Sequence, residues 1–599
     1  MALIVQKFGG TSVANTQMIL AAARKAIRAQ QEGNQVVVVV SAMGKNTDHL
    51  IQLALEINER PPAREMDMLL STGEQVSVAL MAMAVDSLGH KAVSLTGAQI
   101  GIRTDSSHTK ARIRSISTDR VRQLLDDGNI VIAAGFQGID ENLNITTLGR
   151  GGSDTTAVAL AAVLDADACE IFTDVDGVYT TDPRILPEAR LTRQVSYDEM
   201  LELASLGAGV MHSRSIEFGK KFHVPIHVRS SLSDTPGSFI VDEPEAPNLP
   251  VSGATLTKDE ARIAILGVPD APDIHQQIFE PIAAQRVTVD MIVQSPSRAG
   301  AIDISFTVPR HEYEMTRSIV EPIVSRSGGQ LGDCSADVSK VSVVGLGMPQ
   351  QTGVAARMFA ALAREEINLQ MITTSEIKIS VLVERSQALR ALRTVHEEFG
   401  LHLPPDGAVT DPWENLGARK RTISAVDVIR RLQGVAHELE MEGLTIDQIS
   451  LDETQSRITL LHVPNRPGIA AQIFGGIAAE SILVDMIVQS YVSPDYADLS
   501  FTVLRHQFDE ALAAAERLAA GYSACRVLSK REIGKLTVSG IGLRSHTGTA
   551  IGMFQALAES QIALEMVNTS EVRVNAVVDG AAGVRGVEQL REKFRRALR

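Results

Sequence analysis

The fold of the N-terminal part is decided by a stretch from Thr146 to Thr156, which reads TTLGRGGSDTT. It follows apolar runs and opens an alanine-rich run at 157–166, so it predicts a strand, a glycine-rich turn and a helix. Bare glycines and the free N–H groups of a helix start form an anion site. Arg150 adds a guanidinium suited to a carboxylate or a phosphate. Two interpretations of Ser153 and Asp154 stay open: helix capping or catalysis.

Composition describes a large soluble protein. The chain has 599 residues, of which 44% are hydrophobic and 22% charged, and this length predicts roughly three to five domains. The net charge is −15 without a basic tract, which argues against nucleic acid as a partner. Cys169, Cys334 and Cys525 are far apart, so we expect buried thiols in a reduced, cytoplasmic protein and no metal-ligating set.

No membrane partner and no signal peptide are expected. The longest apolar run near the start, Val36–Val40, is far too short to span a bilayer, and the run from Leu3 to Phe8 already has the pattern of a strand.

Short β-rich runs alternate with helical patterns through the N-terminal part. Strands are expected at 3–8, 36–40, 92–95, 130–134 and 170–173, and helices at 15–30 and 67–89. This alternation predicts an α/β domain of three αβα layers with a mostly parallel central sheet. Ligands of such sheets gather at the carboxyl ends of strands. The domain is expected at 1–241, followed by a proline-rich linker at 242–254.

The C-terminal part contains an internal repeat. VDMIVQS at 289–295 recurs at 484–490, SFTV at 305–308 recurs at 500–503, and TSE at 374–376 recurs at 569–571. All three pairs keep the offset of 195 residues that separates 289 from 484. An ungapped register over this length indicates a duplicated block.

Each block is itself double, since Leu266-Gly267 matches Leu346-Gly347 and Met291-Ile292 matches Met371-Ile372. The four resulting units each read strand, loop, helix, strand, strand, helix, strand, which is a ferredoxin-like βαββαβ pattern. The units are expected at 255–335, 336–400, 446–530 and 531–599. A connector is expected at 401–445, and no chemistry is inferred from it.

Besides the glycine-rich turn, three loops carry candidate chemistry. Lys7-Phe8-Gly9-Gly10 follows the first strand, and a lysine beside bare backbone N–H groups suits phosphate; an ordinary tight turn is the alternative. The loop at 41–48 supplies hydroxyls or is simply polar. In the segment 173–184, Asp176-Gly177 is a turn signal, while Tyr179 and Arg184 suit a nucleotide.

Glu74 enters a helix that is otherwise rich in apolar residues. We expect it near the helix N-terminus, where a carboxylate interacts with the helix dipole. The functional alternative is that it binds an amino group.

Taken together, these segments resemble aspartate kinases of the amino-acid kinase superfamily. The resemblance is carried by KFGGTSV at 7–13, STGE at 71–74, GRGGSD at 149–154 and TDVDGVY at 173–179. The repeat units resemble the ACT regulatory domains of that family, in its form with four such domains. The resemblance implies transfer of the ATP γ-phosphoryl group to the side-chain carboxylate of L-aspartate. The product would be 4-phospho-L-aspartate, in the first step towards lysine, methionine and threonine.

The resemblance also implies roles for single residues. Catalysis would fall to Lys7, Arg150 and Asp154. ATP would be bound by Lys7, Phe8, Gly9, Gly10, Ser41, Thr173, Asp174, Tyr179, Asp182 and Arg184. Aspartate would be bound by Thr47, Glu74, Arg150, Gly151, Gly152 and Ser153. A carboxylate is already a nucleophile, so the protein has only to neutralise charge and align two anions. Mg²⁺ would be held by ATP oxygens and water.

One position departs from the family. The motif LGAGVMH at 206–212 has Gly209 where the family often has a lysine. We therefore expect weaker ATP binding, unless Lys220 or Lys221 replaces the missing charge.

The repeat units are expected to bind amino-acid effectors, by the resemblance lysine and threonine, and to join two chains into a homodimer. The candidate effector residues are Asp270, Asp290, Gln294, Asn465, Asp485 and Gln489. The alternative is that these residues merely end strands and cap helices. The third unit has Pro467-Gly468 where the first has Pro272-Asp273, so the third unit is expected to hold the better-formed site.

Two other functions stay open. The chain could phosphorylate another small acid, such as glutamate or N-acetylglutamate, although Glu74 and the repeat units argue against this. It could also be a catalytically inactive amino-acid sensor. Gly209 favours the sensor, and the intact Lys7, Arg150 and Asp154 argue against it.

Overall fold

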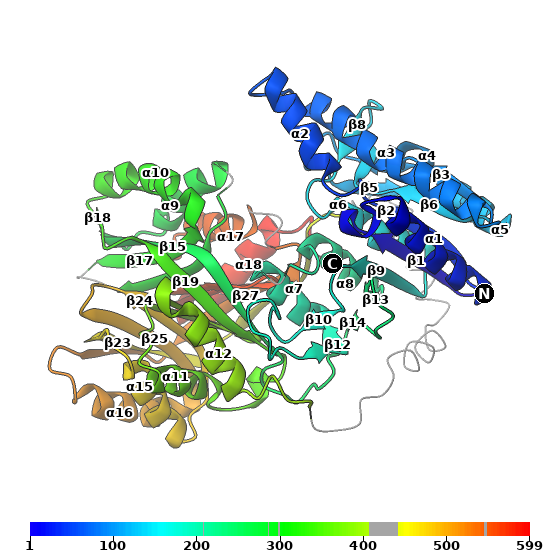
Figure 1. The fold of residues 1–599 in the computed structure, drawn as a ribbon. Coiled ribbons are helices and arrows are strands. Elements are labelled where there is room, and N and C mark those ends of the chain that lie inside the picture. Colours follow the sequence, from blue (N-terminus) through cyan, green and yellow to red (C-terminus); the bar gives the residue numbers. More distant parts are fainter. Residues whose placement is uncertain (208, 286, 297–299, 406–440, 544–547, 599) are drawn as a thin grey trace.

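The computed structural model describes residues 1–207, 209–285, 287–296, 300–405, 441–543 and 548–598 (Figure 1). An N-terminal α/β domain lies at one end of the molecule, and the four repeat units lie at the other. The expected connector at 401–445 falls mostly outside the described residues.

A mostly parallel sheet forms the centre of the N-terminal domain. Its strand order is β12-β14-β13-β9-β1-β2-β6-β3, and only the β13–β14 pair is antiparallel. The strands are β1 (Leu3–Phe8), β2 (Gln35–Val40), β3 (Ala92–Leu95), β6 (Ile130–Ala134), β9 (Ala168–Thr173), β12 (Gln194–Ser196), β13 (Ile226–Ser230) and β14 (Ser238–Val241). Lys7 and Thr173 therefore lie at the carboxyl ends of neighbouring central strands.

Helices cover both faces of this sheet, as the valine run of β2 predicts. Val36, Val38 and Val40 point into a core with α1 and α3, whereas Val37 and Val39 point into a core with α6 and α8. The helices are α1 (Thr16–Gln31), α2 (Asn46–Ile57), α3 (Ala63–Ser87), α4 (Gly97–Ile100), α5 (Asp119–Asp126), α6 (Gly152–Leu164), α7 (Tyr197–Ser205) and α8 (Ser213–Phe222). The expected three-layer α/β architecture is confirmed.

The strand before the glycine-rich turn belongs to a second, smaller sheet of order β5-β4-β7-β8. These strands are β4 (Ile102–Thr104), β5 (Ile113–Ile116), β7 (Gln137–Ile139) and β8 (Ile145–Thr147). A two-stranded ribbon of β10 (Val178–Tyr179) and β11 (Leu191–Thr192) lies further along the chain. The turn at 148–151 therefore connects the small sheet to α6, which packs on the large one.

Within the described residues, α3 is the helix that has the length and apolar composition to cross a membrane. Half of its most apolar window is buried inside the protein, and it packs against α1, α2 and β8. These contacts are those of a core helix.

The repeat units build two further sheets. One has the order β16-β17-β15-β19-β21-β20-β24-β25-β23-β26, with β18 beside β15, and the other has the order β22-β27-β29-β28. Their strands are β15 (Gly253–Pro269), β16 (Asp290–Pro296), β17 (Ala301–Pro309), β18 (Gln330–Leu331), β19 (Ser335–Val344), β20 (Met371–Ser375), β21 (Lys378–Glu384), β22 (Thr445–Asp452), β23 (Gln455–Pro464), β24 (Val484–Tyr491), β25 (Tyr496–Leu504), β26 (Arg526–Lys530), β27 (Ile533–Ile541), β28 (Met566–Thr569) and β29 (Arg573–Asp579).

Each repeat unit contributes two helices. They are α9 (Ile274–Ala284), α10 (Tyr313–Arg326), α11 (Val354–Arg364), α12 (Ala388–Glu398), α15 (Ile469–Ala479), α16 (Phe508–Ala519), α17 (Gly548–Glu559) and α18 (Gly583–Lys593). Single 3-10 turns occur at Gly10–Val13, Arg310–Glu312, Met348–Gln350, Arg385–Gln387, Arg505–Gln507 and Gly580–Ala582.

The second and fourth units differ from the expected strand order. The first half of β15 pairs with β19, from Gly253 opposite Val344 to Thr257 opposite Lys340, while its second half pairs with β17. In the same way, β22 pairs with β27 of the fourth unit. The edge strand of these two units thus precedes the first and third units, instead of following α12 and α18. In the first block one long strand, β15, serves two units, whereas in the second block two consecutive strands, β22 and β23, serve one unit each.

The units pair crosswise within one chain. The second unit joins the third through hydrogen bonds between β20 and β24, with Ile372 opposite Gln489, and through a shared core that includes Phe359 and Phe474. The first unit packs on the fourth, with ring centroids of Phe279 and Phe554 6.1 Å apart. Figure 1 shows the same arrangement, with α9 near α17 and α11 near α15.

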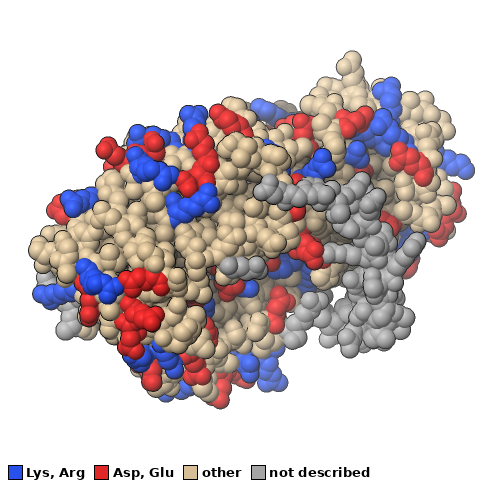
Figure 2. Space-filling model, turned by 90° about the horizontal axis from the view of Figure 1, so that it is seen from below, with Lys and Arg blue, Asp and Glu red and all other residues tan. Residues whose placement is uncertain are grey.

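Charges of both signs alternate with uncharged side chains over the face in Figure 2. The described residues on this face therefore present no extended basic area that would attract a nucleic acid.

Candidate functional site

A buried ion pair joins two of the predicted loops. Lys7, near the end of β1, places Nζ 2.5 Å from Oδ1 of Asp154 in the first turn of α6. The two side chains are only 11% and 13% exposed. The pair therefore fixes the phosphate-type loop after β1 against the N-terminus of α6, where an anion is favoured.

The glycine-rich turn needs its glycines. Gly149 and Gly151 have φ angles of 76° and 74°, in the left-handed region. A Cβ on Gly151 would also lie 2.3 Å from Cβ of His212. Gly151 is itself the N-cap of α6, so Ser153 and Asp154 lie inside the first turn of the helix and neither is its N-cap. The capping interpretation of Ser153 and Asp154 is therefore wrong.

Two loops at the ends of β1 and β2 are tied together. Gly44 N donates to Gly10 O at 3.0 Å, and Ser41 N donates to Phe8 O at 3.1 Å. A Cβ on Gly10 would lie 2.9 Å from Ala42 O. The Phe8 ring is fully buried and stacks on Phe172 with ring centroids 4.7 Å apart. Phe8 can thus offer a nucleotide only its backbone.

Glu74 lies in the middle of α3, so the helix-dipole interpretation is wrong. Its Oε1 accepts a hydrogen bond from Ala42 N at 3.1 Å, and burial raises the pKa of Glu74 to about 7. Its Oε2 is buried and has no hydrogen-bond partner among the described residues. Such an oxygen is costly unless a ligand supplies a donor. Thr47, in the first turn of α2, is half-buried.

Sequence reasoning missed Asp67, which is fully buried on α3. Its carboxylate accepts hydrogen bonds from Thr109 N at 3.0 Å and Thr147 Oγ1 at 2.5 Å, and it lies 2.7 Å from His108 Nδ1. Asp67 thereby secures the strand end that leads into Gly149. An aspartate inside an apolar helical pattern was the signal that could have revealed it.

The predicted nucleotide segment begins at Thr173, the last residue of β9, whose Oγ1 donates to Asp174 Oδ1 at 3.2 Å. Tyr179 lies on β10. Asp182 binds Arg184 with both carboxylate oxygens, and this hydrogen bonding lowers the pKa of Asp182. The Arg184 side chain is 76% exposed, so it lies at the open end of the segment.

The two lysines proposed to compensate for Gly209 are engaged with other partners. Lys220 Nζ lies 2.6 Å from Asp198 Oδ1, and Lys221 Nζ donates to Gly443 O at 3.1 Å. Arg150 is exposed at the glycine-rich turn, which leaves its guanidinium accessible to a ligand.

Of the candidate effector residues, Asn465 and Gln489 line the same small cavity between the second and third units. Gln489 Nε2 donates to Leu369 O, and Asn368 Nδ2 donates to Asn465 Oδ1 at 3.0 Å. The repeat-related contact in the other pair of units joins Gln294 Nε2 to Leu564 O at 2.6 Å. Asp270, directly after β15, is exposed, and partial desolvation raises its pKa.

The candidates Asp290 and Asp485 line two larger cavities. The first cavity, of about 100 Å³, lies between the first and fourth units. The second cavity, of about 300 Å³, lies between the second and third units. Asp290 Oδ2 is 2.5 Å from Lys340 Nζ, and Asp485 forms the repeat-related pair with Lys535.

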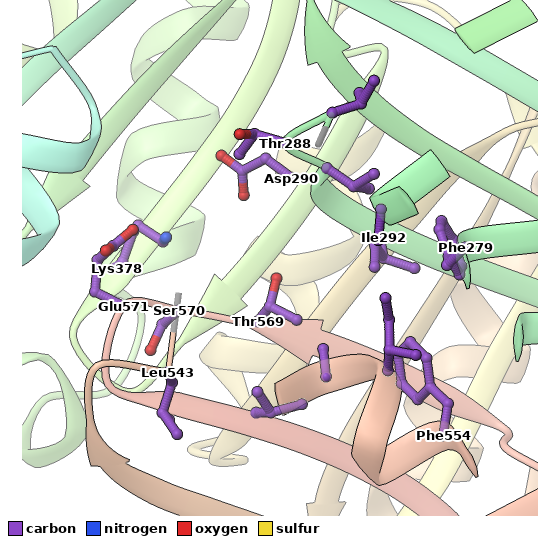
Figure 3. Close-up of a pocket in the computed structure, with 16 residues that line it drawn as sticks. Phe279, Thr288, Asp290, Ile292, Lys378, Leu543, Phe554, Thr569, Ser570 and Glu571 are labelled. Atoms are coloured by element: carbon purple, nitrogen blue, oxygen red, sulfur yellow. The ribbon is translucent and has the colours of Figure 1, made fainter. Parts of the chain in front are cut away.

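Figure 3 shows that the first cavity is polar at one end and apolar at the other. Thr288, Asp290, Lys378, Ser570 and Glu571 form the polar end. Phe279, Ile292 and Phe554 form the apolar end. The cavity therefore matches a small molecule that carries charges beside a hydrocarbon part.

Comparison with known proteins adds to this geometry. A family model described as "Amino acid kinase family" matches residues 2–230, and an ACT domain model matches 341–399 and 536–594. The two ACT matches fall on the second and fourth units, so an ACT identity of the first and third stays a prediction.

Several curated relatives are aspartate kinases. The protein from Pseudomonas putida is 50% identical over 408 residues, which cover 67% of this chain and 99% of that protein. Aspartokinase 2 of Bacillus subtilis is 48% identical over 406 residues, covering 68% and 99%.

Solved structures are also similar. Aspartate kinase from Synechocystis is 38% identical, covers 100% of this chain and 98% of its own, and has a TM-score of 0.52. E. coli aspartokinase III, crystallised with aspartate and ADP, has a TM-score of 0.56 over 66% of this chain and 99% of its own. At 22% identity, that likeness concerns the fold alone.

Proposed function

The chain belongs to the aspartate kinase family, and we propose that it transfers the ATP γ-phosphoryl group to the side-chain carboxylate of L-aspartate. The product is 4-phospho-L-aspartate, which places the reaction at the start of lysine, methionine and threonine synthesis. The observation that carries the proposal is the Lys7–Asp154 pair, which joins a phosphate-type loop to the turn that bears Arg150. The reacting anions would meet between these two loops.

Each residue then has a distinct task. A carboxylate oxygen of aspartate attacks the γ-phosphorus, the bond from the γ-phosphorus to the β–γ bridging oxygen breaks, and ADP leaves. No general base is needed, so the protein supplies charge and alignment. Lys7 and the N-terminus of α6 face the transferred phosphoryl group. Arg150 binds a carboxylate of the substrate. The unpaired oxygen of Glu74 accepts a hydrogen bond from the substrate ammonium.

Mg²⁺ is part of the proposal. Within the described residues, no group of three or more His, Cys, Asp or Glu side chains is placed to hold a metal ion. We therefore assign Mg²⁺ to ATP phosphate oxygens and water. Its chemistry there is neutralisation of the phosphate charge, while the side chains named above position aspartate.

A hydroxamate assay tests the reaction. We expect product with ATP and aspartate, but not with glutamate or N-acetylglutamate, and we expect Lys7→Met to lose activity by about 100-fold or more. Activity with glutamate alone would make the chain a kinase for another acid. Tight amino-acid binding by a wild-type protein without any activity would identify a sensor instead.

We further propose that lysine and threonine inhibit the enzyme from the repeat units. The first cavity supports this because it sets polar side chains beside an apolar end, as a free amino acid with its side chain requires. Asp290 and Lys378 there already bind Lys340 and Glu202, so Thr288 and Ser570 are the polar side chains left to an effector. The small cavity at Asn465 and Gln489 is a second candidate. That cavity is lined by Gly468 of the third unit, and that the third unit holds the better-formed site stays a prediction.

Filling one cavity at a time tests the effector proposal. Thr288→Trp occupies the first cavity, and Leu483→Trp is its matched control, because it lies at the repeat-related position and lines the second cavity. Each effector is titrated alone and together with the other against both variants. Inhibition curves that match those of the wild type in both variants would exclude the first and the second cavity as effector sites.

A homodimer and a cytoplasmic location also belong to the proposal. The repeat units already pair within one chain, so a second copy would contact surfaces that this pairing leaves free. Sedimentation of the purified chain distinguishes a monomer from a dimer, and fractionation of cells locates the protein.

A further inference from the structure

The described C-terminal end of the connector, 441–445, contacts the N-terminal domain. Glu442 lies beside β5, where its backbone N donates to Ile113 O at 3.2 Å. Its carboxylate is 7% exposed and accepts a hydrogen bond from Ile113 N at 2.6 Å. Met441 N also donates to Arg114 O at 3.2 Å, so two backbone hydrogen bonds and one side-chain hydrogen bond hold the turn at 441–442 against β5.

The other oxygen of the Glu442 carboxylate binds Arg214, in the first turn of α8. Arg214 Nε and Nη2 lie 2.7 Å and 2.6 Å from Glu442 Oε1. The same guanidinium donates from Nη1 to Leu148 O and from Nη2 to Ala111 O, the latter at 3.0 Å. Leu148 directly precedes Gly149 and Arg150, so this guanidinium holds the start of the glycine-rich turn.

We propose that Glu442 is a positioning residue for the acceptor site, acting through Arg214 on the turn that carries Arg150. A planar guanidinium held by a carboxylate on one edge keeps its remaining donors in one direction. Without Glu442, the largely buried Arg214 would lack its counter-ion and would reorient towards water. The carbonyl of Leu148 would then lose its anchor.

The segment that leads into the first block has no equivalent of this glutamate. The position 195 residues before Glu442 is Pro247, which carries no carboxylate. Glu442 also stands three residues before Thr445, where β22 begins and pairs with β27 of the fourth unit. A short covalent path therefore connects the sheet of the fourth unit to the turn at the acceptor site.

The inference rests on the proposed role of Arg150 in binding aspartate, and it is tested in the full-length enzyme. We expect Glu442→Ala to raise the KM for aspartate about tenfold, because small misplacements of a positioning group weaken productive binding. The KM for ATP should stay within about twofold. Glu442→Gln, which keeps the shape and one acceptor oxygen, should give a smaller rise. Asp198→Ala is the control: it removes the partner of Lys220 on the same helix α8 and should change neither KM.

Three outcomes would overturn the inference: an unchanged aspartate KM in both Glu442 variants, an equal rise in both KM values, or a lower melting temperature as the sole effect. If Glu442→Ala fails to fold, the isosteric Glu442→Gln still decides between these results. Wild-type enzyme without aspartate-dependent activity would refute the proposed function itself, which is a separate result.

Discussion

Both halves of the molecule bury lysine–carboxylate pairs, but the pairs stand in different surroundings. In the N-terminal domain, Lys7–Asp154 lies at the open ends of strands, near the unpaired oxygen of Glu74. In the repeat units, Lys340 is 2% exposed on a central strand and binds two carboxylates, Glu260 at 2.9 Å and Asp290 at 2.5 Å.

The N-terminal domain thus contains a polar group that lacks a partner in the protein, whereas the charged groups of the repeat units pair with one another. A buried carboxylate oxygen without a hydrogen-bond partner is costly, so the retention of Glu74 in the N-terminal domain points to a substrate. A lysine that neutralises two carboxylates holds strands together. We therefore expect losses of activity from changes in the first region and losses of stability from changes in the second.

The largest effect is expected from Lys340→Met. This change leaves Glu260 and Asp290 buried without their counter-ion, so the free energy of unfolding should fall by about 3–5 kcal/mol. Urea denaturation of the full chain measures this. Adding Glu260→Gln to the same variant should restore part of the loss, and a wild-type midpoint for Lys340→Met would break the comparison.

The second-largest effect is expected from Arg150→Ala, which should reduce activity and leave stability unchanged. Its side chain is exposed, so the melting temperature should not change, whereas the KM for aspartate should rise about 100-fold through the loss of a charge-assisted hydrogen bond. The KM for ATP serves as the internal control. Arg150→Lys should recover only part of the loss, because an ammonium cannot bind a carboxylate with two parallel hydrogen bonds.

Lys535→Met sharpens the comparison inside the repeat. The counterpart of Glu260 is Gln455, so Lys535 pairs closely with Asp485 alone, which is 24% exposed, while Asp452 on the neighbouring strand adds a smaller electrostatic attraction. The loss of stability should be about 2 kcal/mol, less than for Lys340→Met. Equal losses in the two variants, measured side by side in urea, would show that the extra carboxylate has no energetic effect.

The smallest effect concerns pH. The ionised form of Glu74 binds the substrate ammonium, and with a pKa of about 7 it is mostly ionised at pH 8 and mostly protonated at pH 6. The kcat/KM for aspartate should therefore fall roughly tenfold from pH 8 to pH 6. Glu74→Gln should be less active at pH 8 and should lose this pH dependence. A profile for Glu74→Gln that still falls below pH 7 would assign the titration to another group.

Local patterns predicted much of the N-terminal site. The strand ends at Lys7 and Thr173, the glycine-rich turn and the helix after it could all be read from spacing and periodicity, because each depends on a few adjacent residues. Patterns failed where a contact joins distant segments. Asp67 and Thr147 are 80 residues apart, and Arg214 and Glu442 are 228 apart, so no local signal marks either pair.

The amino-acid sequence by itself determined the α/β class, the duplicated block, the glycines of the turn and the family to which the chain belongs. These features can be predicted from the periodicity of apolar residues and from motifs whose residues are contiguous. Only the tertiary structure showed which loops meet and that one oxygen of Glu74 is left without a partner. It also showed that β15 and β22 pair with strands of the second and fourth units. Burial, charge pairing and the pairing of strands between units depend on how distant segments pack together. Local sequence patterns do not predict that packing.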